Sequence, residues 1–436
     1  MAWPFALLVL LGLIVFFMAL GLPVAIAFLA ANIIGVMIFM DGLPGLIQIA
    51  ENSTGLITTY QLAPVPLFIL MGALFFHTGL AQRVFDALDK LLGGLRGRLA
   101  YLTVGGGTLF STLTGNTLAN TAMLGSLLVP EMQRRGYDSR MSLGPIIGTG
   151  GLAMIIPPSG LAVLLGSIAN IDVGKLLIAG LIPGLILAFM FVVLITVQLR
   201  IDPDCAPSYD LPKVSLKDKL VAFVVNILPM SLVVTMVIGF IMLGIATPTE
   251  SAAFGSVGVI VLAVAFRLFS WAALRQSVQG TMRVSGMVFF IIVGSAVFSN
   301  LLAFSGATRG LLQWSTSFEL APWVLLAVMF LVLLFLGMFM DQVSMMLITV
   351  PIFFPLAQSV GYDLIWFGLI VLLALEMSLM TPPFGLLLYV MLGVAPAGTK
   401  LSHVVRAAVP YLVCDVILVV ILVLFPGLAL YLTRFM

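Results

Sequence analysis

The chain has 436 residues, 62% of them hydrophobic and only 8% charged, with a formal net charge of +2. A soluble domain carries roughly 25% charged residues, so this composition excludes a soluble globular protein and predicts an integral membrane protein embedded in a lipid bilayer. The net charge gives no indication of nucleic-acid binding, and the spacing of Cys205 and Cys414 predicts neither a disulfide framework nor a metal site.

Ten segments are long and apolar enough to be predicted as membrane spans. They cover residues 3–20, 22–40, 63–82, 142–168, 176–198, 221–244, 251–268, 284–305, 364–393 and 408–432. The N-terminal segment lacks the basic region of a cleaved signal peptide, so we interpret it as the first span. Two basic amphipathic segments, 83–98 and 270–284, are expected to lie along the membrane interface.

Two further apolar segments, 99–133 and 323–357, are interrupted near their middle by Gly, Pro and polar residues. Each is too long for one untilted membrane helix and too short for two full spans. We therefore predict that each forms a re-entrant hairpin of two half-helices.

With ten spans and two hairpins, the Lys and Arg residues are distributed very unequally between the two sides of the membrane. Sixteen of the 19 Lys and Arg residues fall on one side, and Lys175, Arg309 and Arg434 fall on the other. Because cytoplasmic loops are enriched in Lys and Arg, the crowded side is predicted to be cytoplasmic. Both termini are then predicted to be periplasmic.

The two halves of the chain repeat each other at a shift of 225 residues. The matching positions are Pro23 and Pro248, Pro130 and Pro355, Gly136–Asp138 and Gly361–Asp363, Pro157–Pro158 and Pro382–Pro383, Gly160 and Gly385, and Lys175 and Lys400. No gap is needed between these points, so a single internal duplication explains all of them.

We therefore divide the chain into a first repeat (1–200), a cytoplasmic linker (201–220) and a second repeat (221–436). Each repeat contains five spans and one hairpin, and five is odd, so the second repeat is predicted to be inverted relative to the first. Inverted repeats with broken helices near the midplane are typical of secondary transporters. The two diprolines interrupt equivalent helices, 142–168 and 364–393, because proline cannot donate the helical hydrogen bond.

Six stretches carry a resemblance to a known family. They are VPLFILMGALFFHTGLAQR (65–83), TGNTLANTAMLGSLLVPEMQRRGYD (114–138), IIPPSGLAVLLGSIANIDVGKLLIAGLIPG (155–184), ATPTESAA (246–253), LGMFMD (336–341) and TPPFGLLLYVMLGVA (381–395). Through these stretches the chain resembles, along nearly its whole length, the large membrane subunit of tripartite ATP-independent periplasmic (TRAP) transporters.

The resemblance implies an all-α elevator-type transporter, in which a transport domain slides against a scaffold domain. It also implies sodium-coupled uptake of a small organic anion, such as a carboxylate, a sugar acid or a sulfonate, across the bacterial inner membrane. Two partners are implied: a small four-helix membrane subunit, and a periplasmic substrate-binding protein that delivers the solute.

The first hairpin tip (112–120) and the first broken helix (148–159) are the candidate elements of one sodium site. Its predicted ligands are Thr114, Gly115, Asn116, Gly148 and Pro157. Hydroxyl, amide and carbonyl oxygens suit a hard cation. The alternative is a polar packing motif between membrane helices, where small polar residues are common.

The second hairpin tip (337–344) and the second broken helix (376–383) are expected to form a second sodium site by symmetry. Its predicted ligands are Gly337, Asp341, Ser378 and Thr381. A carboxylate inside a membrane is expensive and usually functional. Asp341 could bind sodium, cap a half-helix or carry a proton, and Glu376 could relay a proton or accept a structural hydrogen bond.

The solute is expected to bind between the hairpin tips and the broken helices. The candidate substrate-binding residues are Asn116, Thr117, Ser159, Asp341 and Thr381. No arginine lies clearly within the membrane to bind an anion, so recognition would depend on half-helix dipoles, polar side chains and water.

A second hypothesis is a receptor-independent sodium symporter for divalent anions, with a related elevator architecture. An enzyme is not indicated, because the chain has no H-E-x-x-H, no G-x-S-x-G and no nucleotide-binding motif. His77 and His403 have no metal-ligand spacing, Asp415 is assigned no chemistry, and Glu250 is expected to contact a partner subunit.

Overall fold

The computed structural model describes residues 3–40, 42–48, 51, 62–92, 95–114, 117–207, 215–317, 321–338, 340–382, 385–396 and 398–436. These residues are almost entirely helical and contain no strand, so the predicted all-α class is confirmed for them. Gly115, Asn116 and Pro383, three residues of the predicted sites, lie outside the described residues.

The described part of the first half is a succession of helices. They are α1 (Trp3–Ala19), α2 (Val24–Phe39), α4 (Pro64–His77), α5 (Leu80–Leu92), α6 (Arg98–Thr114), α7 (Thr117–Arg134), α8 (Ser139–Ile155), α9 (Gly160–Ile168), α10 (Val173–Ala179) and α11 (Leu181–Ile201). A 3₁₀ turn, η2 (Pro203–Cys205), follows α11.

The second half begins with a helix that contains one π-helical turn. Its elements are α12 (Leu216–Ala222), the π-turn η3 (Phe223–Ile227), α13 (Leu228–Met242), α14 (Pro248–Ala265), α15 (Trp271–Phe304), α16 (Ala307–Ser317), α17 (Pro322–Gly337), α18 (Gln342–Ser359), α19 (Leu364–Met380), α20 (Leu386–Val394), α21 (Leu401–Leu424), α22 (Gly427–Leu430) and the 3₁₀ turn η4 (Leu432–Phe435).

By length and composition, six helical segments of the described residues could cross a membrane, and eight could if each of two bent pairs is one span. The bent pairs are α4 with α5, at 63°, and α8 with α9, at 43°. Helices α1, α17 and α19, and residues 25–39 of α2, are apolar but shorter. The chain is thus a multi-pass membrane protein, while the count of ten spans stays a prediction.

Both diprolines lie next to a helix end. Helix α8 ends at Ile155 and α9 begins at Gly160, with Pro157 and Pro158 between them. Helix α19 ends at Met380 and α20 begins at Leu386, with five residues between them. Each interruption frees backbone carbonyls and exposes a new helix N-terminus in the interior of the protein.

The helix boundaries repeat at the shift of 225 residues found in the sequence. Helix α7 (Thr117–Arg134) maps onto α18 (Gln342–Ser359), and α8 maps onto α19, without an offset at either end. Asp138 and Asp363 occupy the same place in the two halves, and each caps the helix that follows it by accepting backbone N–H bonds.

One predicted segment is organised differently. Residues 270–284, expected to lie along the interface as a separate segment, belong to the 34-residue helix α15, which continues to Phe304. The physical reason is that no proline interrupts residues 271–304, so the backbone hydrogen bonds continue through the polar part. Helix α5, the other amphipathic segment, is a separate helix at 63° to α4.

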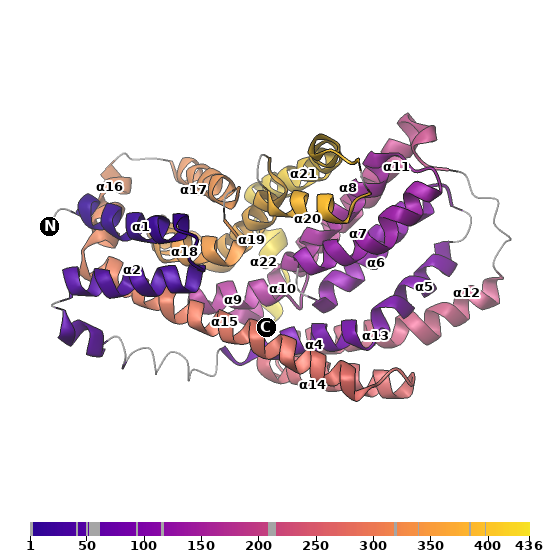
Figure 1. The fold of residues 1–436 in the computed structure, drawn as a ribbon, viewed down its shortest axis with the longest axis horizontal. Helices are drawn as coiled ribbons and strands as arrows, with labels where there is room; N and C mark the ends of the chain where they lie inside the picture. The colour runs from indigo at the N-terminus through magenta and orange to yellow at the C-terminus, as the bar shows by residue number, and fades with distance from the viewer. Residues whose placement is uncertain are drawn as a thin grey trace.

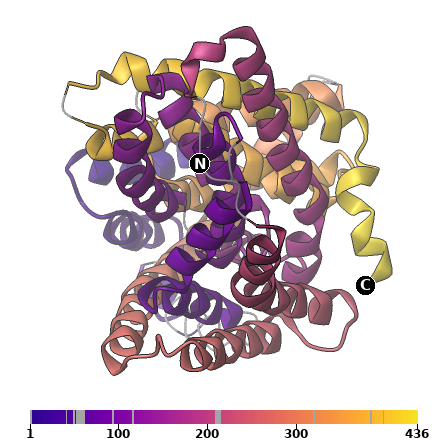
Figure 2. The ribbon, with the colours of Figure 1, turned by 90° about the vertical axis from the view of Figure 1, so that its right-hand side faces the viewer.

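Two groups of helices, called bodies below, pack against each other through one continuous core; Figure 1 labels their helices. In one, α15 packs against α2 and α4, and α14 packs against α4 and α13. In the other, α8 contacts α6, α7, α11, α19 and α21, and every residue from Met141 to Ile155 is buried. Figure 2 shows the same helices from the right-hand side of Figure 1.

Candidate functional site

A cavity of about 450 Å³ lies between the two bodies. One wall comes from α4 and α15, including Phe68 and Val288. The other wall is formed by the starts of α7, α9, α18 and α20, which are the helices that follow the two hairpin tips and the two diproline breaks. The structure therefore brings the four predicted site segments to one cavity.

Thr117 is the first residue of α7 and lines this cavity. Thr117 is 2% exposed, and its hydroxyl has no hydrogen-bond partner among the residues that the structure describes. A buried hydroxyl without a partner is costly unless water, an ion or a ligand satisfies it. Thr117 is thus a polar group available to a bound solute or ion.

Asp341 lines the same cavity from the second hairpin tip. Its carboxylate caps α18 by accepting the backbone N–H groups of Val343, at 3.0 Å, and Ser344, at 3.2 Å. It also accepts the Ser344 hydroxyl. Of the three predicted roles of Asp341, helix capping is the one that the structure shows, and Asp341 also lines the cavity.

The two breaks contribute Ser159 and Thr381. Ser159 is buried between two cavity-lining residues, Pro158 and Gly160, and its hydroxyl accepts the Ala162 N–H at 3.2 Å to cap α9. Thr381 is the C-cap residue that follows α19, and its hydroxyl donates to the Met377 carbonyl at 2.7 Å. Both side chains therefore shape the helix ends beside the cavity.

The described members of the first predicted sodium set, Thr114 at the end of α6, Gly148 in α8 and Pro157 in the break, are not shown to share one site. Gly148 packs against α21, because a Cβ on it would lie 2.4 Å from Cδ1 of Tyr411. The glycine that contacts α7 is Gly150, where a Cβ would lie 2.1 Å from the Thr121 hydroxyl oxygen. Pro157 is buried in the break after α8.

The second predicted sodium set is more compact. Gly337, at the end of α17, lies directly against Ser378 of α19. The Ser378 hydroxyl donates to the Leu375 carbonyl at 2.7 Å, which leaves its oxygen free to accept. The tip of the second hairpin and the second broken helix are therefore in contact.

A chain of polar side chains near the first hairpin tip was not predicted from the sequence. The Asn120 amide donates to the Ser111 hydroxyl, which donates to the Thr149 carbonyl at 3.0 Å. All three residues are fully buried. The signal in the sequence was the polar content of 111–120, but hydropathy does not show which helix each side chain faces.

Asp415 of α21 was assigned no chemistry, yet it interacts electrostatically with Glu376 of α19. Both carboxyl groups are buried, and in the described part of the chain none of their four oxygens has a hydrogen-bond partner. The structure therefore gives no support to a role for Glu376 as a structural hydrogen-bond acceptor.

Glu250 and the two histidines lie away from the cavity. Glu250 forms a capping box with Thr247 at the start of α14. His77 ends α4, where its ring meets Phe76 edge-on, and His403 is exposed near the start of α21. Among the described residues, no group of three His, Cys, Asp or Glu side chains could hold a metal ion.

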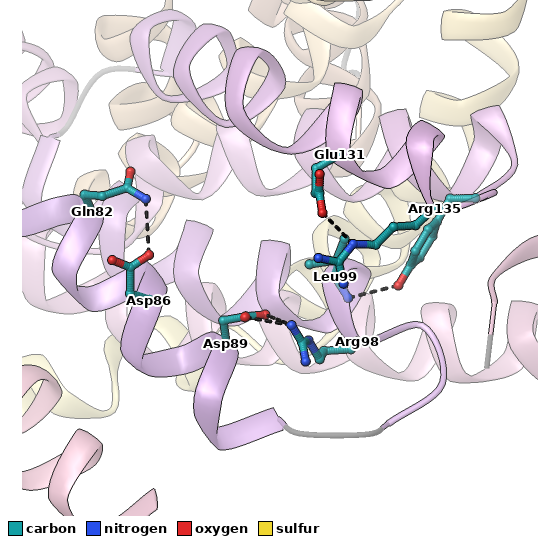
Figure 3. A network of polar contacts seen from close by, with 8 residues as sticks. Gln82, Asp86, Asp89, Arg98, Leu99, Glu131 and Arg135 are labelled. Carbon is teal, nitrogen blue, oxygen red and sulfur yellow. Dashed lines mark hydrogen bonds and ion pairs between the residues drawn. The ribbon is translucent and has the colours of Figure 1, made fainter. Parts of the chain in front are cut away.

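A polar network joins the far ends of the first hairpin helices to α5 (Figure 3). Arg98, at the start of α6, pairs with Asp89 of α5 at 2.6 Å, and the Leu99 N–H donates to the Tyr137 hydroxyl at 3.1 Å. Glu131 pairs with Arg135 near the end of α7. This network fixes the base of the hairpin whose tip reaches the cavity.

A family model described as "Tripartite ATP-independent periplasmic transporter, DctM component" matches residues 11–428. The chain is 33% identical over 378 residues to the C4-dicarboxylate TRAP transporter large permease protein DctM of Pseudomonas aeruginosa, which covers 86% of this chain and 87% of that protein. It is 29% identical over 416 residues to the sialic acid TRAP transporter large permease protein SiaM of Vibrio cholerae, with 94% and 95% covered.

A solved structure has a similar fold. The YdaH transporter of Alcanivorax borkumensis superimposes with a TM-score of 0.61 over 88% of this chain and 89% of that one, at 16% sequence identity. At this identity the likeness concerns the fold alone.

Proposed function

Because the chain belongs to the DctM-component family of TRAP transporters, we propose that it carries out sodium-coupled uptake of a small organic anion across the inner membrane by an elevator mechanism. The family consists of transporter permeases rather than enzymes. Three parts of this proposal go beyond membership of the family: coupling to sodium, the sliding motion of the transport domain, and delivery of the solute by a periplasmic protein.

The observation that carries the proposal is the cavity at which the four interrupted segments meet. Thr117 reaches it from the first hairpin, Pro158 from the first break, Asp341 from the second hairpin and Leu386 from the second break. Helix ends and unwound backbone at the centre of a membrane protein are tolerated where they line a cavity, and transporters use such ends to hold substrates and coupling ions.

The arrangement of the walls supports an elevator. All four interrupted segments belong to one wall, whereas continuous parts of α4 and α15 form the other. A body that carries both hairpins could slide along α15 without breaking its own contacts. We propose that the α4, α13, α14 and α15 body is the scaffold, and that the body around α8 and α19 is the transport domain.

The sodium proposal rests on the oxygens at the cavity and at the breaks. Thr117 offers an unpartnered hydroxyl and Asp341 a carboxylate that faces the cavity. The contact of Gly337 with Ser378 brings a third oxygen to the second hairpin tip. Oxygen ligands of this kind suit a hard cation, so the residues present fit a coupling ion.

Members of this family work with a substrate-binding protein and a small membrane subunit. We propose that this chain has one partner of each kind, with the small subunit built of four helices and the binding protein in the periplasm. The predicted orientation, with both termini periplasmic, places Lys and Arg residues mainly in the cytoplasm.

The test is uptake by proteoliposomes that contain this chain with its small subunit. Labelled succinate and sialic acid are supplied with and without the cognate binding protein, under an inward sodium or potassium gradient. We expect uptake only with both the receptor and sodium. Equal uptake in potassium would contradict sodium coupling, and uptake without the receptor would favour the receptor-independent symporter.

A matched variant ties the result to the cavity. Thr117→Val keeps the shape of the side chain and removes only the unpartnered hydroxyl, so the protein should fold normally. We expect it to lower sodium-dependent uptake by about tenfold, the loss that follows from one hydrogen bond of about 1.4 kcal/mol. Unchanged uptake by this variant would show that the Thr117 hydroxyl does not contribute to the binding site.

A further inference from the structure

Two carboxyl groups lie inside the proposed transport domain, away from the cavity. Glu376 of α19 is 1% exposed and Asp415 of α21 is 0% exposed, and neither residue lines the cavity. In the described part of the chain, their four oxygens have no hydrogen-bond partner. A carboxylate buried in this way is costly, because it loses its hydrogen bonds to water and gains none in the protein.

Helices α8 and α21 pack side by side and run in the same direction. A Cβ on Gly144 would lie 2.8 Å from the carbonyl oxygen of Ala407. A Cβ on Gly148 would lie 3.1 Å from the Cβ of Tyr411. Each step of four residues along α8 is therefore matched by a step of four residues along α21. One helical turn further, Asp415 is level with the turn of α8 that follows Gly148.

Glu376 reaches the same turn of α8 from α19. Its carboxylate lies directly against Gly151, where the atoms of a larger residue would overlap with it. The carboxyl groups of Glu376 and Asp415 also interact electrostatically. The bare backbone at Gly151 therefore makes room for the Glu376 carboxyl group beside Asp415, between three helices.

No cation lies beside this pair of carboxyl groups in the part of the chain that the structure describes. Helices α9, α17, α18 and α22 pack against α19 or α21 and have no titratable side chain. In α8, α10, α11, α20 and α21, the charged and other titratable side chains outside the pair are exposed, apart from the buried Tyr411 and Cys414. The exposed ones are Arg140, Lys175, Arg200, Tyr389, His403 and Arg406.

The aspartates next to these helices are also accounted for. Asp138, Asp172, Asp341 and Asp363 each cap a helix N-terminus by accepting backbone N–H bonds. The buried pair thus has two acidic groups and no neighbouring positive charge. Two adjacent carboxyl groups in such surroundings cannot both be ionised.

The ligand that fits this place is a proton. A metal cation needs several oxygen ligands, but the backbone carbonyls of α8 near Gly151 and of α19 near Glu376 belong to continuous helical turns. A proton needs no additional space. A protonated carboxyl group also gains an O–H donor, which can donate to the neighbouring carboxylate.

The pair lies one turn before both helix breaks. Helix α8 ends at Ile155, four residues after Gly151, and α19 ends at Met380, four residues after Glu376. Leu379, in the last turn of α19, lines the cavity. The charge of the pair is therefore placed close to the helix ends that border the cavity.

We propose that Glu376 and Asp415 form a proton-binding site, and that the transport domain carries this proton across the membrane together with the solute. One carboxylate binds a proton from water on one side of the membrane, keeps it while the pair is buried, and returns it to water on the other side. The carrying step rests on the proposed function and adds a second coupling ion to it, whereas proton binding can be measured without transport.

Infrared spectroscopy of the full chain in lipid tests the binding of the proton. The C=O stretching band of protonated carboxyl groups is recorded at neutral pH, in sodium buffer and in potassium buffer. The test variant combines Glu376→Gln with Asp415→Asn. Because an amide has the shape of a protonated carboxyl group, this variant is expected to fold, which thermal unfolding checks. Asp363→Asn is the matched control, since Asp363 is exposed at the start of the same helix as Glu376.

We expect the wild type and D363N to show the band in both buffers, and the double variant to lose it. Absence of the band from the wild type in both buffers would overturn the inference, and so would an unchanged band in the double variant. A band that is present in potassium but absent in sodium would show that the pair binds sodium instead, which would overturn it as well.

The carrying step is tested in the proteoliposomes of the uptake assay, loaded with a pH-sensitive dye and held at a fixed membrane potential. Uptake of labelled succinate or sialic acid and the internal pH are recorded together. We expect the interior to become more acidic during sodium-driven uptake by the wild type, and less acidic per solute taken up in the double variant. Uptake without acidification would overturn the carrying of a proton. Lack of any uptake would contradict the proposed function, while the infrared band would still decide whether the pair binds a proton.

Discussion

A methyl group on Gly337 would lie 2.0 Å from the hydroxyl oxygen of Ser378, so the end of α17 and the side of α19 touch through a bare backbone. This contact joins the second hairpin tip to the second broken helix. No larger residue fits at position 337 unless one of the two helices moves.

We expect Gly337→Ala to destabilise the protein by about 1–3 kcal/mol, the usual range for overpacking a tight contact. Rotation of Ser378 cannot relieve the clash, because its Cβ would lie only 2.2 Å from the new methyl group. Thermal unfolding in detergent and uptake are the two measurements. Gly105→Ala in α6, where no atom lies within 4 Å, is the control and should lose no stability, because alanine is favoured over glycine inside a helix by about 1 kcal/mol.

The double variant Gly337→Ala, Ser378→Gly tests the cause. Removing the Ser378 side chain makes room for the methyl group, so stability should recover relative to Gly337→Ala alone. If the double variant is no more stable than the single one, the contact is not the reason for the glycine.

Asp341→Asn should separate the capping role of Asp341 from the role of its charge. Asparagine caps helices as well as aspartate does, so the variant should fold. If the carboxylate helps to hold sodium, the sodium concentration for half-maximal uptake should rise by about tenfold or more. Asp341→Ala should also lose the cap and about 0.5–2 kcal/mol of stability.

Asp363→Asn is the matched control for this charge removal. Asp363 caps α19 in the same way, by accepting from Ile365 and Trp366, but it is exposed and does not line the cavity. It should leave the sodium dependence of uptake unchanged. Normal sodium dependence in Asp341→Asn would reduce Asp341 to a helix cap.

The segments that form the site could be predicted from the sequence, whereas the contacts between these segments could not. Proline chemistry placed the interruptions beside the diprolines, and α8 ends at Ile155 and α19 at Met380, next to them. The polar residues of the hairpin tips likewise marked Thr117 and Asp341, which face one cavity. Such features can be predicted from the sequence because they depend on the backbone of the residues concerned and not on contacts with other helices.

Contacts between helices could not be predicted in the same way. In α8 all faces are buried, so neither hydropathy nor periodicity indicates that Gly148 faces α21 while Gly150 faces α7. The proximity of Asp415 to Glu376 depends on the packing of α21 against α19. The continuity of α15 was missed because its polar first part and apolar second part were treated as separate segments.

The pair of Asp89 and Arg98 is predicted to stabilise the base of the first hairpin. The Arg98 side chain is 9% exposed and that of Asp89 is 36% exposed, so the pair is partly shielded from water. We expect Asp89→Ala to cost about 1.5–3 kcal/mol, the range for hydrogen bonds to charged groups. A double-mutant cycle with Arg98→Ala, followed by thermal unfolding, measures the coupling.

The ion pair between Arg134 and Glu131 serves as the comparison. Its N–O distance is similar, at 2.7 Å, but the Arg134 side chain is 77% exposed. Exposed ion pairs contribute about 0–1 kcal/mol, so Arg134→Ala should have a small effect. An Asp89→Ala variant as stable as Arg134→Ala would show that the Asp89–Arg98 pair does not hold α5 to the hairpin.

The inverted arrangement of the two halves makes a prediction about Arg134 and Ser359. The two residues are 225 positions apart, each ends the second helix of its hairpin, and both are exposed. If the halves are inverted, these residues lie on opposite sides of the membrane. A membrane-impermeant thiol reagent should then label Ser359→Cys in intact spheroplasts, and Arg134→Cys only after the membrane is permeabilised.

Both substitutions are expected to be well tolerated, because neither side chain is buried and neighbouring Gly136 and Gly361, with φ of +84° and +82°, are left intact. The labelling therefore reports orientation rather than misfolding. Labelling of both cysteines in intact spheroplasts would place the two hairpin bases on the same side. The second repeat would then have the same orientation as the first. The proposal that two inverted repeats form the cavity would be wrong.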